Sequence, residues 1–441
     1  MKNKTSILFT LLAVLALFGC KARQPAVILK NNTTYFVDSK TGNDANNGTS
    51  TAAPWKTLAK FSGLSLKAGD SVRFASGATF VGGCIIESSG SDNHPIVITS
   101  YGVGDQPVFS NPDYSLLNGN VFHVKGRHIT IDGLHFDKCA NSPGKVDKDI
   151  LSVGAVYGIT GSDFLTVKNC LFVDCPIGIY VNGQHSLITK NTLRDCNRFL
   201  SEPDWGPIGI VIGNAYNDVS YNTCTNYVKV GGNYGADGGF IELEDRYFGN
   251  KVHHVNVHHN TSIANQGFLE IESKVTGDSL NVYYNFSDDF QQFIFYWGGN
   301  HSRVDNNTVI RTRPSNHGSV NTVFTMRNPD FSLKNNIFLV ANGIQVLVTA
   351  PYNVGNYAKV IHENNIYYCL DASTADPLGK PLGEGEKIID PQFLEIANSD
   401  YHLNANSPAF KAGQRLGYST DLENKMLPKD SAPDIGAYQF K

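Results

Sequence analysis

Short apolar alternations, each followed by an asparagine, recur along the chain from about residue 128 onward. In the clearest copies two apolar residues flank one polar residue and the asparagine follows two positions later, as in Leu165-Thr-Val-Lys-Asn169. Because apolar residues at every second position mark a strand with one buried face, each copy predicts a short strand that ends at a turn. After a first copy with Gly133 in the same place, the repeated residues are Asn169, Asn191, Asn222, Asn260, Asn285, Asn307, Asn336 and Asn365.

The spacing of these asparagines indicates a solenoid. Successive copies lie 22 to 38 residues apart, and a short period lengthened by insertions is typical of the coils of a parallel β-helix. An asparagine at each corner tolerates the left-handed backbone of a tight turn, and stacked asparagine side chains can hydrogen-bond along that corner. The sequence therefore predicts an all-β fold, a right-handed parallel β-helix solenoid with an N-terminal cap and an irregular C-terminal cap.

A second strand follows each asparagine, and its alternation assigns side chains to the inside or the outside of the coil. When the inward residues of successive coils are aligned, the outward residues fall into two columns, each with one residue from every coil. The first column reads Tyr180, Val211, Glu242, Glu270, Phe295, Thr325 and Gln345. The second column reads Asn182, Gly213, Glu244, Glu272, Trp297, Arg327 and Leu347. Four glutamates thus meet on two neighbouring coils, and this outer face is the expected functional face.

The segments on either side of the repeat differ from it and are predicted to be caps. Residues 35–102, with a loop rich in glycine and asparagine and a helix start at Pro54, resemble the N-terminal cap of right-handed parallel β-helix proteins, many of which act on polysaccharides. The tail resembles the closing segment of exported β-helix proteins and is expected to cover the last coil. The predicted divisions are a signal peptide at 1–20, a tether at 21–33, the β-helix with its N-terminal cap at 34–385, and a C-terminal capping segment at 386–441.

The first twenty residues indicate export. A basic start precedes an apolar stretch from Ile7 to Phe18, which is shorter than the roughly 20 apolar residues of a membrane span. Cys20 directly follows the small residue Gly19, and this arrangement resembles a bacterial lipobox. The resemblance implies cleavage before Cys20 and a lipid on its sulfur, hence a lipoprotein anchored to the bacterial cell envelope and facing the periplasm or the outside. A plain secretory signal is the alternative.

Composition narrows the classes of partner. The formal net charge of −4 offers no basic surface for nucleic acid, so a polysaccharide is the expected partner, the lipid anchor is the expected membrane contact, and the chain is expected to be a monomer. Of the eight cysteines, seven remain after Cys20 is set aside. Cys139, Cys175 and Cys196 fall at similar places in the repeat, which favours stacked buried thiols over a disulfide framework.

Crowded carboxylates give the functional face its chemistry. Equivalent residues of stacked coils lie about 4.8 Å apart, and two charges at that distance repel by about 1 kcal/mol in water and about 3–4 kcal/mol at an effective dielectric of 20. A bound cation, a raised carboxyl pKa or basic neighbours can relieve this repulsion, and oxygen-rich clusters suit Ca²⁺. The alternative without function is a solvated polar face screened by Arg246, Lys251 and Lys274.

Glu270-Ile-Glu272, with Lys274 shortly after it and a β-helix coil following, resembles the chondroitinase B and alginate lyase family of polysaccharide lyases. In that family an alternating Glu pair and an Asn of a neighbouring coil hold Ca²⁺, a Lys abstracts the C5 proton of the uronate, and an Arg on the next coil assists. Here the next coil carries Trp297 in place of that Arg, so Arg327, one coil further, is the substitute. The resulting assignment is Glu242, Glu270, Lys274 and Arg327 to catalysis, and Glu244, Glu270 and Glu272 to the metal.

These assignments favour a polysaccharide lyase that cleaves a uronate-containing glycan by β-elimination with Ca²⁺ assistance. Carboxylates beside Lys274 would raise its pKa and make it a poorer base, so the alternative bases are Lys251, His258 and His301.

Two other functions remain open. A glycoside hydrolase needs no metal, since two carboxyls on adjacent coils lie near the roughly 5–5.5 Å of retaining enzymes and a pair that includes Asp237 can reach the inverting separation. Asp237, Trp297 and His301 would then bind substrate, with Trp297 as a sugar platform. A non-catalytic glycan-binding solenoid is the other alternative, because the fold alone does not determine function.

Overall fold

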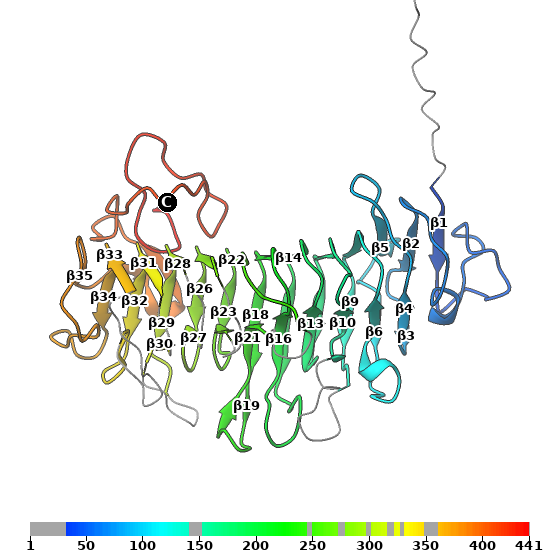
Figure 1. Ribbon diagram of the computed structural model, residues 1–441, viewed down its shortest axis with the longest axis horizontal. Helices are drawn as coiled ribbons and strands as arrows, with labels where there is room; N and C mark the ends of the chain where they lie inside the picture. The colour runs from blue at the N-terminus through cyan, green and yellow to red at the C-terminus, as the bar shows by residue number, and fades with distance from the viewer. Residues whose placement is uncertain are drawn as a thin grey trace, which may run out of the picture. The chain divides into compact units, whose positions relative to one another are not determined.

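The computed structural model describes residues 32–140, 152–244, 249–271, 278–296, 301–314, 322–326, 330–347 and 360–440. Within these ranges the chain winds through successive coils, and each coil contributes strands to three parallel sheets, here named A, B and C (Figure 1). The predicted all-β, right-handed parallel β-helix is thereby confirmed. Among the described residues no helix has the length and apolar character needed to cross a membrane.

From β2 to β30 each coil adds one strand to sheets A, B and C in that order, whereas within the described residues the first and last coils lack some of these strands. Sheet A contains β1 (Thr34–Val37), β2 (Ser71–Ala75), β5 (Ile96–Tyr101), β8 (Ile129–Asp132), β11 (Thr166–Lys168), β14 (Leu187–Thr189), β17 (Asp218–Ser220), β22 (Asn256–His258), β25 (Asn281–Tyr283), β28 (Ser302–Asp305), β31 (Phe331–Lys334) and β33 (Val360–Glu363). Sheet B contains β3 (Thr79–Val81), β6 (Val108–Ser110), β9 (His135–Asp137), β12 (Leu171–Val173), β15 (Thr192–Cys196), β18 (Thr223–Tyr227), β23 (Thr261–Ile263), β26 (Phe286–Asp288), β29 (Thr308–Arg311), β32 (Ile337–Val340), β34 (Ile366–Cys369) and β35 (Lys387–Ile388). Sheet C contains β4 (Cys84–Ile86), β7 (Phe122–Val124), β10 (Val156–Gly158), β13 (Ile177–Val181), β16 (Ile208–Ile212), β21 (Gly239–Leu243), β24 (Leu269–Ile271), β27 (Ile294–Tyr296) and β30 (Phe324–Met326).

The remaining regular elements are short. In the part of the chain that the structure describes, two antiparallel hairpins and three 3₁₀ turns join the coils or follow them: β19 (Lys229–Val230) with β20 (Ala236–Asp237), β36 (Phe393–Glu395) with β37 (Asp400–Leu403), η1 (Leu58–Lys60), η2 (Leu117–Gly119) and η5 (Ile396–Asn398).

The corner between sheets A and B holds the repeated asparagines, and its backbone differs from the expectation. The left-handed residue is the one before the asparagine, with φ of +56° at Tyr221 and +54° at His259. The asparagine itself is buried, and its side chain runs along the corner. Asn222 Nδ2 donates to the Asn260 side-chain oxygen at 3.1 Å and to the carbonyl oxygen of Ile188 at 2.8 Å. The expected bonds between asparagines are confirmed, whereas the expectation that asparagine itself adopts the left-handed conformation is wrong for this ladder.

This asparagine ladder consists of Asn191, Asn222, Asn260, Asn285, Asn307, Asn336 and Asn365. Asn169 is not a member, because it occupies the left-handed corner position with φ of +54°. Cys170 takes the ladder place in that coil, and its amide donates to the Asn191 side-chain oxygen at 3.0 Å. The sequence pattern alone assigns the ladder position of this coil to Asn169, one residue too early, because it does not distinguish the two adjacent corner positions. At the other end the ladder stops at Glu386, which accepts from Asn365 at 2.6 Å.

The C-terminal segment lies along the side of the coils. Outward residues of sheet B such as Ile310 and Leu339 are fully buried in a cluster with Tyr401 and Ile435 (Figure 1). The segment begins on the last coil, where β35 pairs with β34. Its later residues cover apolar side chains on the outside of sheet B, which would otherwise be exposed to water. Near the end of the solenoid Leu378 is fully buried in the interior core.

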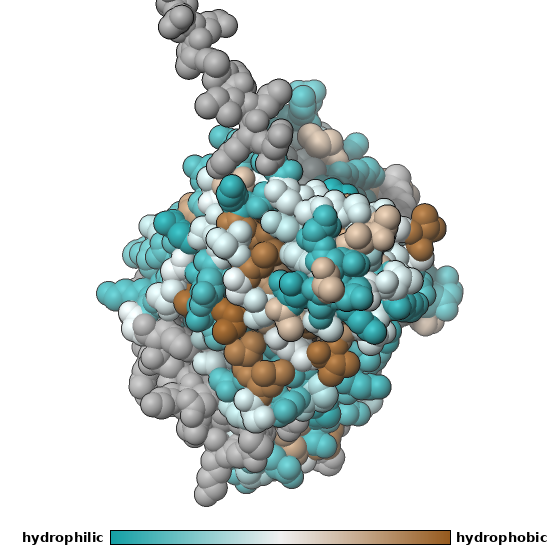
Figure 2. Space-filling model, turned by 90° about the vertical axis from the view of Figure 1, so that its right-hand side faces the viewer, coloured by the Kyte–Doolittle hydropathy of each residue, from teal (hydrophilic) through white to brown (hydrophobic). Residues whose placement is uncertain are grey.

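The first coil is closed by the N-terminal cap, as expected. Trp55, Leu58 and Phe61 are 5%, 6% and 2% exposed and belong to the interior core. Seen from this end, hydrophobic areas are separated by a mostly hydrophilic or neutral surface (Figure 2). The cap thus keeps the apolar interior of the solenoid from ending in one open patch.

The cysteines of the described chain are buried free thiols, as expected: Cys84, Cys139, Cys170, Cys175, Cys196, Cys224 and Cys369. The Sγ atoms of Cys139 and Cys175 lie 3.4 Å apart on adjacent coils. Burial raises the pKa of the Cys175 thiol well above its ordinary value, which keeps this thiol in its neutral form.

Candidate functional site

The first outward column of sheet C places two glutamates side by side. Glu242 on β21 and Glu270 on β24 are direct register partners in neighbouring parallel strands, and each is partly exposed. Val211 precedes Glu242 in the column and Phe295 follows Glu270. The predicted register of Glu242 with Glu270 is thereby confirmed, and equivalent backbone atoms of such strands lie about 4.8 Å apart.

Two glycines leave bare backbone next to this pair. Gly239 aligns with the outward residue Ile208 of the preceding coil, and Gly267 lies beside Gly239 in the following coil. A side chain at Gly239 would place its Cβ 3.2 Å from the carbonyl oxygen of Gly267, which is tighter than ordinary packing. Both glycines are partly exposed. A flat ligand such as a sugar ring can therefore lie directly on the backbone beside the carboxylates.

An apolar wall covers the outer face of sheet C on the N-terminal side of the pair. Tyr180 and Val211, which point outward, are only 1% and 3% exposed because Leu200 packs on them from the connection between β15 and β16. Trp205 of the same connection packs against this cluster. The open part of the face therefore begins at Glu242.

The β19–β20 hairpin extends this wall. It projects beyond β21 at the edge of sheet C (Figure 1), and it packs on the neighbouring connection through the amide of Asn233, which donates to the carbonyl oxygen of Pro203 at 3.1 Å. The Lys229 ammonium lies 5.0 Å from the centre of the Phe199 ring, within the range of a cation–π contact. The two insertions thus brace one another immediately before Asp237.

Asp237 ends the hairpin and leads into β21. Its carboxylate accepts a hydrogen bond from the amide of Gly206 at 2.8 Å, and the amide of Gly238 also stabilises the ionised form. Even so, burial among surrounding protein atoms raises the pKa of Asp237 above its ordinary value, although part of the residue still reaches solvent. A carboxyl that is reluctant to ionise, on a residue that partly reaches solvent, suits proton donation or hydrogen bonding to a sugar.

The second outward column does not form the expected acidic patch. Glu244 lies just beyond the end of β21 and is 2% exposed, so the expectation that it shares the open face is wrong. In this column Glu244 comes after Gly213 of the preceding coil. Because Gly213 has no side chain, there is room beside it for the buried Asn182 amide. Four other candidates, Glu272, Lys274, Trp297 and Arg327, lie outside the described residues.

The alternative bases are placed away from the glutamate pair. His258 is in sheet A, where its Nε2 lies 3.0 Å from an Asp218 carboxylate oxygen. His301, predicted to bind substrate, lies in the turn that enters sheet A, with its Nδ1 3.0 Å from Asp278. Lys251 is exposed in the turn before β22. The structure therefore brings none of these three together with Glu242 in sheet C.

The metal assignment rests on residues that are only partly described. Within the described ranges no group of three or more His, Cys, Asp or Glu side chains is arranged to hold a metal ion. Glu242 and Glu270 offer carboxylate oxygens side by side, but the further ligand Glu272 lies outside those ranges and Glu244 is buried. Ca²⁺ stays a prediction from the sequence.

Sequence reasoning missed the wall of Leu200 and Trp205 beside the site. A signal was present, because Asn191 and Asn222 are separated by 31 residues rather than 22, which marks an insertion in that coil. The spacing does not tell on which face an insertion folds, since that depends on contacts such as the one between Asn233 and Pro203.

The chain is a parallel β-helix that carries Glu242 and Glu270 on the outer face of sheet C, and solved structures of polysaccharide lyases and of a glycoside hydrolase share this fold. The pectate lyase Pel9A has a TM-score of 0.57 at 15% identity, covering 93% of this chain and 98% of that one. A rhamnogalacturonan lyase has a TM-score of 0.58 at 16% identity, covering 83% and 92%. A glycoside hydrolase has a TM-score of 0.51 at 11% identity, covering 76% and 96%. Identities this low establish the shared fold and leave the activity open.

Comparison of sequences adds one local similarity. A stretch of 98 residues is 37% identical to a lacto-N-biosidase of Bifidobacterium longum subsp. longum. The match covers 21% of this chain and 6% of that protein, so the chain spans only a small part of the length of this relative. No protein-family model matches the chain.

Proposed function

We propose that the protein is a carbohydrate-active enzyme, a glycoside hydrolase that uses Glu242 and Glu270 as its catalytic carboxyls. The observation that carries this proposal is their position as direct register partners on the open part of sheet C. The sequence alone favoured a lyase, but the bases that a lyase needs are either outside the described residues or in another sheet. A hydrolase requires only two neighbouring carboxyls, and the register of Glu242 with Glu270 supports this choice.

The spacing of the pair suits a retaining mechanism. Neighbouring parallel strands hold equivalent residues about 4.8 Å apart, close to the roughly 5–5.5 Å between the two carboxyls of retaining enzymes. At that distance the second negative charge is disfavoured by about 1–4 kcal/mol, depending on the local dielectric. In a retaining mechanism one carboxyl protonates the leaving group while the ionised partner attacks the anomeric carbon, and repulsion between two negative charges favours this division of roles.

The surroundings provide a place for the sugar. A ring laid on Gly239 and Gly267 would have the glutamates at one edge, and Phe295 in the next coil offers an apolar neighbour. Asp237, with its raised pKa, would hydrogen-bond a hydroxyl group of the substrate. The local similarity to a lacto-N-biosidase supports a hydrolase and suggests oligosaccharides that contain lacto-N-biose as first substrates to test.

The test is a panel of neutral and uronate-containing glycans, assayed for released reducing sugar and, by NMR, for the configuration of the new anomeric centre. Glu242→Gln and Glu270→Gln are expected to lower kcat by about 100-fold or more without lowering Tm. Glu87→Gln, an exposed glutamate at the far end of the same sheet, is the matched control. Wild-type rates in both site variants would refute the assignment.

A Ca²⁺-assisted polysaccharide lyase is the second candidate, favoured by the sequence Glu270-Ile-Glu272 followed by Lys274. It predicts that a uronate-containing glycan yields an unsaturated product that absorbs in the ultraviolet, and that a chelator abolishes the reaction. Reducing sugar released without that absorbance, and insensitive to chelator, selects the hydrolase. Glycan binding without any cleavage would leave a binding protein.

We also propose that the enzyme acts outside the cytoplasm, tethered to the cell envelope through a lipid on Cys20. The supporting observation is the basic and apolar start of the chain that ends at Gly19 and Cys20. Mass spectrometry of the mature N-terminus, in the wild type and in Cys20→Ser, tests it. A mature wild-type chain that carries no lipid mass on Cys20, or that differs from the variant by only the mass of the Cys-to-Ser change, would refute lipidation at this cysteine.

A further inference from the structure

The outward column that contains Glu242 and Glu270 changes from covered to open between two neighbouring coils. In the three coils before Glu242, on β10, β13 and β16, the outward side chains of this column are 4%, 1% and 3% exposed: Tyr157, Tyr180 and Val211. Glu242, Glu270 and Phe295, in the next three coils, are each partly exposed. Because a side chain that water does not reach is also closed to a ligand, a glycan meets this column only from Glu242 onward.

The cover over the earlier coils comes from the connection between β15 and β16. Leu200 of this connection forms one buried cluster with the three covered side chains, and Trp205 packs against the cluster. The β19–β20 hairpin, which is braced against the same connection, projects beyond β21 at the edge of sheet C (Figure 1). A glycan that continued from Glu242 toward the N-terminal coils would therefore run into protein.

The open features run along the axis of the solenoid. Gly239 and Gly267 leave bare backbone on the same two coils that carry the glutamates, so a row of sugars that lies on both glycines passes from coil to coil. Its free direction leads to Phe295 in the following coil. In the other direction the cover begins at once, so the sugar over Gly239 is the end of its chain.

Asp237 is placed to recognise that end. Gly206 directly follows Trp205, and its amide donates to the Asp237 carboxylate at 2.8 Å, so this carboxyl lies where the cover meets β21. A carboxylate has room for about four hydrogen bonds, and the amides of Gly206 and Gly238 leave part of this capacity free. A terminal sugar carries a hydroxyl group where an internal sugar continues through a glycosidic bond. A hydrogen bond from that hydroxyl to Asp237 is therefore available only to a chain end.

We propose that the protein cleaves glycans from a chain end, with the terminal sugar held between Trp205 and Asp237 and the rest of the chain extending over Phe295. This proposal rests on the proposed function, in which Glu242 and Glu270 are the catalytic carboxyls. It adds the position of the cut along the substrate.

The experiment uses the full-length protein with polygalacturonate and a β-galactan as polymers, and with lacto-N-tetraose as an oligosaccharide that contains lacto-N-biose. On a polymer, cleavage from an end releases short products of one length from the first time point, and the viscosity hardly falls while reducing sugar appears. On the oligosaccharide, one end is blocked, either by reduction of the reducing end or by fucosylation of the other. A block at the held end should lower kcat/KM by about 100-fold or more, and the block that acts identifies this end.

The outcomes separate this proposal from the proposed function. A ladder of product lengths with rapid loss of viscosity, or an oligosaccharide rate that neither block lowers, overturns cleavage from an end and leaves the hydrolase in place. No cleavage of any glycan by the wild type refutes the hydrolase, and this proposal with it.

Two site variants test the cover and the carboxyl. Trp205→Ala removes part of the cover, so products of internal cleavage should appear. Asp237→Ala should lower the ratio of kcat/KM between free and blocked chains by about tenfold or more, as expected for loss of a hydrogen bond to a charged group. Asp237→Asn keeps an acceptor for the Gly206 amide and should restore part of this ratio.

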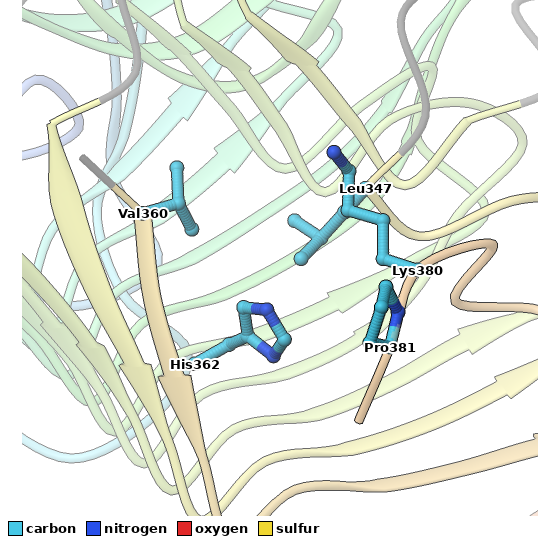
Figure 3. A pocket seen from close by; sticks show the side chains of 5 residues that line it. All are labelled: Leu347, Val360, His362, Lys380 and Pro381. Atoms are coloured by element: carbon cyan, nitrogen blue, oxygen red, sulfur yellow. The ribbon is translucent and has the colours of Figure 1, made fainter. Parts of the chain in front are cut away.

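The control is Pro381→Ala, at an exposed residue that lines a cavity of the last coil (Figure 3). It should keep the product lengths and the ratio of the wild type. A merely structural role of Asp237 would lower Tm without changing the ratio. Wild-type product lengths in Trp205→Ala together with a wild-type ratio in Asp237→Ala would overturn the proposal.

Discussion

Replacing Asn260 by alanine tests the idea that the asparagine ladder is the main polar support of the solenoid. Asn260 is fully buried, and its side-chain oxygen accepts the backbone amide of Asn222 at 3.0 Å. Its Nδ2 donates to the carbonyl oxygen of Val219 at 2.8 Å and to Asn285 at 3.1 Å. An orphaned buried amide costs about 1–3 kcal/mol, and the two lost donor bonds add about 1 kcal/mol each. The expected destabilisation is therefore about 3–5 kcal/mol.

The control is Asn169→Gly, one repeat outside the ladder. Asn169 is exposed and has φ of +54°. Its side-chain amide donates to the partly exposed carboxylate of Asp132 at 2.8 Å. Because glycine adopts this backbone freely, the change should cost less than about 1 kcal/mol. The free energy of unfolding is measured in guanidinium chloride, and hydrogen exchange at the Asn222 amide reports the local effect in a repeat protein that can unfold in parts. A cost for Asn260→Ala no larger than that for Asn169→Gly would refute the reasoning.

Two further predictions concern the same corner. Cys170→Asn should add one asparagine to the ladder and raise the free energy of unfolding by about 0.5–1 kcal/mol. The reason is that Cys170 Sγ lies 3.9 Å from the Ile131 carbonyl oxygen, which an asparagine amide could reach. A lower stability in denaturant titration would contradict this prediction. Burial and the neighbouring His258 lower the pKa of His259 from 6.5 to about 4, so the unfolded chain takes up a proton that the folded chain refuses. Stability should fall as the pH drops from about 6.5 to about 4, by on the order of 3 kcal/mol. His259→Asn, which tolerates the φ of +54°, should remove most of this loss when Tm is compared at pH 7 and pH 4.5; an unchanged pH dependence would show that other groups cause it.

The fold could be predicted from the sequence because two independent patterns agree. Alternating apolar residues mark the strands, and a recurring asparagine marks one corner, so even coils of unequal length align. The same alignment placed Glu242 beside Glu270 correctly, since register between neighbouring coils follows from which side chains face inward.

What could not be predicted depends on contacts between distant segments. Glu244 has the same alternation as Glu242, yet it lies just beyond the end of the strand at Leu243 and is buried. The cover provided by Leu200 comes from an insertion without any periodic pattern. The location of the tail beside sheet B likewise depends on outward apolar residues of that sheet, such as Ile310, which look like core residues in the sequence.

The asparagine ladder also separates what must stay constant from what can vary. From β8 to β34 the corner between sheets A and B always contains two residues, whereas the connections that build the wall enter between sheets B and C. The ladder therefore fixes the distance between successive coils, whatever loops are inserted between the other sheets. The loops that determine glycan specificity can therefore change, by evolution or by design, while the separation of Glu242 and Glu270 stays the same.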